Sequence, residues 1–68
     1  MQISARNQFT GTLVSVTPGA VNATVKVDIG AGNIVTSSIT NESVEQLGLA
    51  AGDTVTVIVK ASDVMIGK

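Results

Sequence analysis

Hydrophobic and polar residues alternate one by one along several stretches of the chain. Between Ala20 and Ile29 every second residue is apolar, and the residues between them are mostly polar. Three further stretches alternate, two of them less strictly: Thr54–Lys60, Phe9–Thr17 and Asn33–Ile39. Because the side chains of a strand point alternately to its two faces, this period of two predicts four half-buried β-strands. Shorter strands are expected at Ile3 and at Val64–Ile66.

The segments between these strands carry turn and helix signals. Pro18-Gly19 separates the first two strands and Gly30–Asn33 the next two, so the first three strands should form a meander. Asn41–Gly48 offers capping residues, acids in its first turn, apolar residues three apart and a terminal glycine, which predicts one short helix. Gly52-Asp53 then turns the chain into the last long strand. This order is typical of a small OB-like Greek-key barrel in an all-β protein with one short helix.

Composition narrows the possible functions. The 68 residues include no Cys and no His, which removes disulfides and the commonest metal ligands and general base, so neither a metal-cation site nor an enzyme is expected. A core of this size is marginal without disulfides or metals, so oligomerisation is expected. The longest apolar runs are three or four residues, and no signal peptide is evident, so we expect a cytoplasmic protein without a membrane span.

The charges and aromatic residues argue against nucleic acid as a partner. Four basic residues stand against five acidic ones, for a net charge of -1, and Phe9 is the only aromatic residue. Single-stranded nucleic acid usually needs a basic groove and aromatic stacking platforms, and both are missing. Gly30-Ala31-Gly32 is interpreted as a hairpin turn and not as a phosphate loop, since no Lys-Ser/Thr and helix N-terminus follow it.

Most of the useful hydrogen-bond donors lie near the two ends of the chain. Ser4–Gln8 contains a hydroxyl, two amides and the only arginine, Arg6. Lys60-Ala61-Ser62 follows the last long strand with an ammonium, a backbone N–H and a hydroxyl. Arg6 presents a planar fork of N–H groups that suits an oxyanion. From composition alone, solvated chain ends are the alternative interpretation.

Several motifs together resemble one protein family. The opening Ser4–Thr12 is similar to that of the molbindins, the small molybdenum-pterin-binding (Mop) proteins. Further matching motifs follow at the expected spacing: Ser38-Ile39-Thr40, Leu47-Gly48-Leu49, Gly52-Asp53 and Val59–Val64. The resemblance covers all 68 residues and identifies residues 1–68 as a single Mop/TOBE-type domain.

The resemblance implies a homohexamer, built as a trimer of dimers, that binds molybdate or tungstate between subunits for storage or homeostasis. Ser4, Arg6 and the backbone near Ala5 would come from one chain. Four residues would come from a neighbour: Thr40, Lys60, Ala61 and Ser62. A second oxyanion site is expected in the loop of Gly19, Ala20, Val21 and Asn22, through backbone N–H groups and the Asn22 amide.

The chemistry of the anion fits this donor set. Molybdate at neutral pH is a fully deprotonated dianion, so it accepts hydrogen bonds and donates none. A site made only of donors would disfavour phosphate, whose remaining O–H would have no acceptor. Two alternatives stay open: a regulatory or protein-interaction module, and a carrier of a molybdenum-pterin cofactor. The shortage of aromatic residues leaves little to stack on a pterin, so no organic cofactor is expected.

Overall fold

The computed structural model describes all 68 residues and contains four strands and two short helices. Their bounds are β1 (Asn7–Pro18), β2 (Asn22–Asp28), β3 (Ile34–Thr40), α1 (Asn41–Leu47), β4 (Thr54–Val59) and the 3-10 helix η1 (Ala61–Asp63). The four main strands and the helix are confirmed. The short strands predicted at Ile3 and Val64–Ile66 are wrong for the single chain. A strand needs a neighbour for its backbone groups, and neither segment pairs with any strand here.

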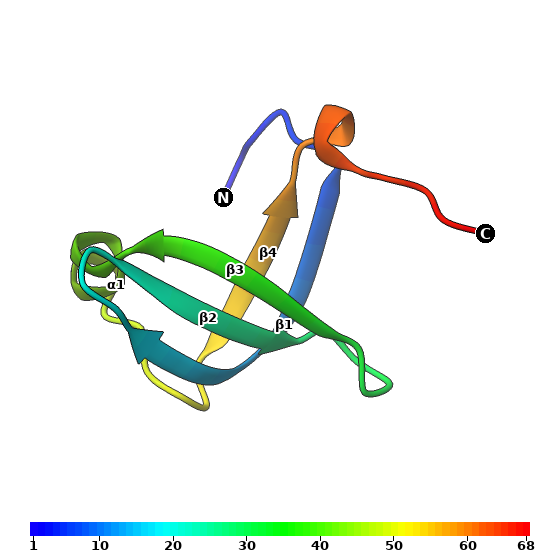
Figure 1. The fold of residues 1–68 in the computed structure, drawn as a ribbon. Helices are drawn as coiled ribbons and strands as arrows, with labels where there is room; N and C mark the ends of the chain where they lie inside the picture. The colour runs from blue at the N-terminus through cyan, green and yellow to red at the C-terminus, as the bar shows by residue number, and fades with distance from the viewer.

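The four strands form one antiparallel sheet in the order β3-β2-β1-β4 (Figure 1). β1, β2 and β3 make the predicted meander, and β4 returns after α1 to lie beside β1. This spatial order is that of a Greek key. The start of β1 therefore lies beside the end of β4, where Asn7 pairs with Val59.

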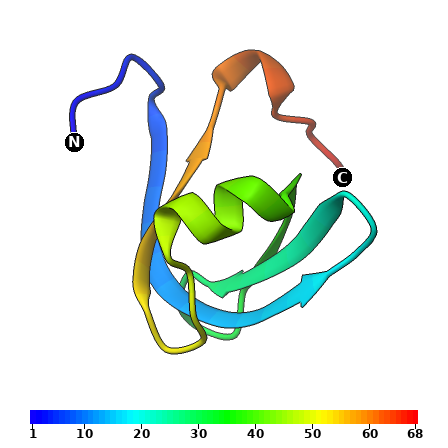
Figure 2. The same cartoon turned by 90° about the vertical axis from the view of Figure 1, so that its left-hand side faces the viewer.

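β1 is long enough to pair with two strands because it bends. Residues Asn7–Thr12 pair with β4 and residues Thr12–Pro18 with β2, and a bulge between Leu13 and Ser15 interrupts the pairing with β2. Figure 2 shows the resulting curve of β1. Such bulges bend a strand and increase its twist. Gly11 packs tightly against the end of β2, and a Cβ atom there would collide with the carbonyl oxygen of Asp28. The curled, OB-like sheet therefore depends on a small residue at this position.

The helix α1 begins and ends as its sequence predicts. The Thr40 side chain accepts a hydrogen bond from the Ser43 backbone N–H at 3.0 Å, which caps the first turn. Gly48 stops the helix in the left-handed conformation, with φ +62°. α1 lies next to β2 and β3 and far from the start of β1 (Figures 1 and 2). Neither α1, with seven residues, nor η1, with three, could span a membrane.

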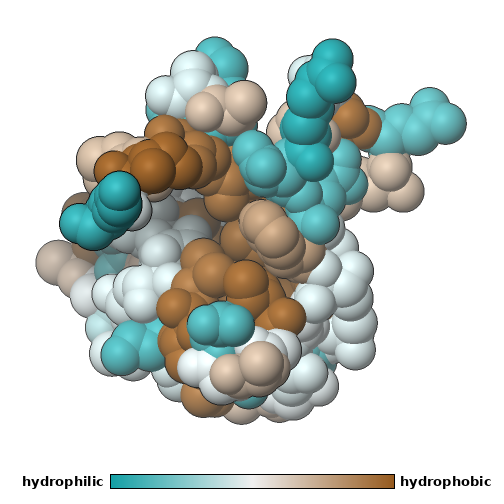
Figure 3. All heavy atoms as spheres, turned by 90° about the vertical axis from the view of Figure 1, so that its right-hand side faces the viewer, coloured by the Kyte–Doolittle hydropathy of each residue, from teal (hydrophilic) through white to brown (hydrophobic).

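The core of the single chain is small. Only four of the 68 residues are buried: Leu13, Ala23, Val25 and Val27. The inward face of β2 is therefore as predicted, except that Val21 lies before the strand and is 71% exposed. Leu47, Met65 and Ile66 are 69%, 92% and 89% exposed, and Figure 3 shows hydrophobic side chains gathered at the surface around a hollow. This much exposed apolar surface favours association with further chains.

Candidate functional site

The two donor-rich segments of the sequence meet at one end of the sheet. Arg6 directly precedes β1 and Lys60 directly follows β4, and these strands are paired up to Asn7 and Val59. The Asn7 side-chain amide also donates a hydrogen bond to the Val59 carbonyl oxygen at 3.1 Å. Ser4–Arg6 and Lys60–Ser62 are held side by side as a result.

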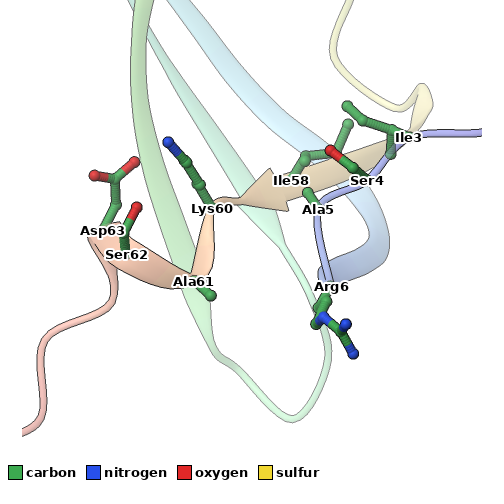
Figure 4. Close-up of a pocket in the computed structure, with 9 residues that line it drawn as sticks. All are labelled: Ile3, Ser4, Ala5, Arg6, Ile58, Lys60, Ala61, Ser62 and Asp63. Atoms are coloured by element: carbon green, nitrogen blue, oxygen red, sulfur yellow. The ribbon is translucent and has the colours of Figure 1, made fainter.

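These segments line a hollow of about 640 Å³, called the donor hollow below (Figure 4). It is lined by nine residues: Ile3, Ser4, Ala5, Arg6, Ile58, Lys60, Ala61, Ser62 and Asp63. Six of these nine were predicted as site residues from the sequence. One chain brings all six together, whereas the sequence analysis expected Lys60–Ser62 to come from a neighbouring subunit.

The donors of this hollow are unused by the fold. The side chains of Ser4, Arg6, Lys60 and Ser62 donate no hydrogen bond within the chain. The backbone N–H groups of Ser4, Ala5, Arg6, Ala61 and Ser62 are also unpaired. Polar groups that the fold leaves unpaired in a concave place are available to a ligand. The arrangement is therefore suited to a ligand that only accepts hydrogen bonds.

The 3-10 helix η1 fixes one wall of the donor hollow. The Asp63 backbone N–H donates to the Lys60 carbonyl oxygen at 2.9 Å, and the Val64 N–H donates to the Ala61 carbonyl oxygen at 3.3 Å. These bonds fold the chain back immediately after β4. In Figure 4 the side chains of Lys60, Ser62 and Asp63 point to the same side, and the Arg6 guanidinium points away from them.

Asp63 is a lining residue that the sequence analysis missed. In the sequence it stands only as one of the five acidic residues. The signal that could have found it is its spacing, three residues after Lys60 across one tight turn. The lining of the donor hollow therefore includes a carboxylate, a group that accepts hydrogen bonds and donates none.

Thr40 lies at the other end of the sheet from the donor hollow. It pairs with Asn22 at the start of β2, and its hydroxyl both caps α1 and donates to the Ser43 Oγ at 2.8 Å. Thr40 and Lys60 of one chain therefore do not line a common site. Only a second copy could bring a Thr40 to the donor hollow.

The predicted second site lies next to Thr40, in the connection between β1 and β2. Gly19 donates its N–H to the Asn22 carbonyl oxygen at 2.8 Å, and Asn41 binds the loop twice, through its backbone N–H to Val21 and its side-chain amide to Gly19. The Asn22 amide and the N–H groups of Ala20 and Val21 make no hydrogen bond within the chain. Asn41 Oδ1 is buried without a partner. We call this region, Gly19–Asn22 with Thr40 and Asn41, the turn end.

The glycine-rich segment after β2 has a structural role. Gly30–Asn33 forms the hairpin between β2 and β3, closed by hydrogen bonds between Ile29 and Asn33 and between Asn33 and Gly30, each 2.9 Å. The interpretation of Gly30-Ala31-Gly32 as a turn is thus confirmed. No cluster of three or more His, Cys, Asp or Glu side chains could hold a metal ion.

Comparison with known proteins identifies the family. Residues 3–66 match the TOBE domain, which is nearly the whole chain. The chain belongs to the TOBE domain family. The "Probable molybdenum-pterin-binding protein" of Haemophilus influenzae is 46% identical over 67 residues, covering 98% of this chain and 97% of that protein. The resemblance to the molbindins is therefore confirmed.

Solved structures support the same grouping of this TOBE-domain chain. A molybdate-binding protein from Sporomusa ovata is 37% identical, matches with a TM-score of 0.93 and is covered completely, as is this chain. The cytoplasmic molybdate-binding protein ModG, in a structure with molybdate bound, is 42% identical with a TM-score of 0.90. That match covers 96% of this chain and 46% of ModG. The OB-like fold of the family is confirmed.

Proposed function

We propose that this TOBE-domain protein binds molybdate, or the chemically similar tungstate, in the donor hollow. The observation that carries the proposal is the set of donors that the fold leaves unused around Arg6 and Lys60. A tetrahedral dianion has only acceptor oxygens, so it suits a hollow lined by unused donors. The names of the matched relatives, which are molybdenum-pterin-binding or molybdate-binding proteins, support the same ligand.

We further propose that the binding unit is a homohexamer, a trimer of dimers, with the oxyanion sites between subunits. The small core and the exposed Leu47, Met65 and Ile66 support association. In such an assembly Thr40 of one chain would join Ser4, Arg6 and Lys60 of another. The loop Gly19–Asn22 would supply the second kind of site, with neutral donors alone.

The role proposed for the protein is storage and homeostasis of the oxyanion in the cytoplasm, with residues 1–68 acting as one Mop/TOBE-type unit. Its relatives are named as binding proteins, and one of them is described as cytoplasmic. Binding without conversion fits a site that holds donors and no nucleophile paired with a base. No organic cofactor is part of the proposal.

Native mass spectrometry and calorimetric titration test these proposals together. Molybdate, sulfate and phosphate are added separately to the purified chain. We expect a hexamer that gains several molybdate ions, with heat released on molybdate addition and much less on phosphate addition. A monomer that binds none of the three anions would contradict both the assembly and the ligand. A hexamer without anion binding would contradict the ligand alone.

A further inference from the structure

One carboxylate shares the donor hollow with its two cations. Arg6 and Lys60 contribute two positive charges to the lining, and Asp63 contributes one negative charge. A carboxylate is an unexpected lining group for an anion site, because it repels the ligand. Its presence calls for a role other than direct binding.

The backbone of η1 places this carboxylate close to Lys60. The Asp63 N–H donates to the Lys60 carbonyl oxygen, so the two residues close one tight turn. Their side chains point to the same side in Figure 4. The Asp63 carboxylate accepts no hydrogen bond within the chain, so the fold does not require it.

We infer that Asp63 is a specificity-determining residue that sets how strongly the donor hollow prefers dianions over monoanions. This inference rests on the proposed oxyanion function of the hollow. The Coulomb energy between Asp63 and a bound anion is proportional to the charge of the anion. Asp63 therefore weakens the binding of a dianion twice as much, in free energy, as the binding of a monoanion of the same shape. The carboxylate thereby lowers the affinity for the dianion. It also reduces the preference for a dianion over a monoanion.

The test uses two tetrahedral, acceptor-only anions that differ in charge, molybdate (two negative charges) and perrhenate (one). Asp63→Asn removes the carboxylate charge and keeps the side-chain size. Because the two charges would interact through water, we expect roughly three- to tenfold tighter molybdate binding at low salt. The gain for perrhenate should be the square root of that, roughly two- to threefold, because the energy is halved. Both gains should shrink as salt is raised, since exposed charges are screened.

Glu45→Gln is the matched control, because it makes the same change of net charge at a side chain that does not line the donor hollow and makes no hydrogen bond in the chain. We expect less than a twofold effect of this control on either anion. Weaker molybdate binding in Asp63→Asn, equal gains for both anions, or gains matched by Glu45→Gln would overturn the inference. A wild-type protein that binds neither anion would instead overturn the proposed function as well.

Discussion

The two ends of the sheet carry similar polar residues but use them differently. At the turn end, the Thr40 hydroxyl caps α1, the Gly19 N–H closes its own turn, and Asn41 ties the loop to the helix. At the donor hollow, the side chains of Ser4, Arg6, Lys60 and Ser62 make no hydrogen bond within the chain. Cationic side chains, Arg6 and Lys60, line the donor hollow, whereas the turn end has none.

This difference separates polar groups that hold the fold from polar groups that can hold a ligand. The Thr40 hydroxyl already donates its proton to the Ser43 Oγ and must give up that bond before it can donate to an anion. An unpaired donor beside a positive charge has no such competing partner within the chain, and its bonds to an anion are charge-assisted. The donor hollow should therefore dominate anion affinity, and the turn end should matter more for stability.

The largest expected effect comes from removing both cations of the donor hollow. Because charge-assisted hydrogen bonds contribute about 1.5–3 kcal/mol each, the double variant Arg6→Ala/Lys60→Ala should lose at least about 100-fold in molybdate affinity. Calorimetric titration measures the loss. Lys26→Ala/Lys68→Ala removes the same charge elsewhere and should bind nearly as the wild type does. Similar losses in both double variants would mean that net charge, and not the donor hollow, attracts the anion.

Single substitutions within the donor hollow should rank by charge. We expect Arg6→Ala or Lys60→Ala to weaken molybdate binding about tenfold or more, and Ser62→Ala by only a fewfold, since a neutral hydrogen bond contributes about 0.5–1.5 kcal/mol. Lys60→Arg, which keeps the charge, should retain most of the affinity. Equal losses for Lys60→Ala and Ser62→Ala in the titrations would contradict this ranking.

Much of the fold could be predicted from the sequence because its signals are local. The period of two along β2 and the glycine after Leu47 each act within a few residues, and both predictions hold. The short strands at Ile3 and Val64–Ile66 failed because strand pairing is not local: an apolar, extended segment becomes a strand only when another strand lies beside it.

The site was predictable only in part for a similar reason. Arg6 and Lys60 were found by residue type, but they are 54 residues apart in the sequence, and only the pairing of β1 with β4 shows that the segments carrying them lie side by side in one chain. Asp63 was missed because a lone carboxylate is usually solvated, and its place in the lining depends on the turn of η1. Thr40 lies at the end of the sheet opposite to the donor hollow because it pairs with Asn22, and its residue type does not reveal that pairing.

An intermediate effect is expected from the apolar surface that the single chain exposes to solvent. Met65 is 92% exposed, so Met65→Glu should cost the isolated chain little. If Met65 is buried between subunits, the same change should dissociate the proposed hexamer. Native mass spectrometry across a range of protein concentrations tests this, with Met65→Leu as the conservative control. A hexamer that persists in Met65→Glu would place Met65 outside the interface.

The smallest effect is expected at the turn end, where substitutions of Thr40 distinguish a role in the fold from a role in anion binding. Thr40→Ala removes the cap of α1 and should cost about 1 kcal/mol of unfolding free energy, measured by urea denaturation, whereas Thr40→Ser keeps the capping oxygen and should cost less. If a neighbour's Thr40 also donates to the anion, Thr40→Ala should weaken molybdate binding a fewfold, and Thr40→Ser should not. To reach the anion, the hydroxyl proton would have to leave the Ser43 Oγ, whereas the cap uses the oxygen as an acceptor and can stay. Molybdate should then stabilise Thr40→Ser more than Thr40→Ala, because the variant that binds more tightly gains more stability from the ligand. Equal molybdate affinity in the two variants would confine Thr40 to the fold and leave the donor hollow as the whole of the primary site.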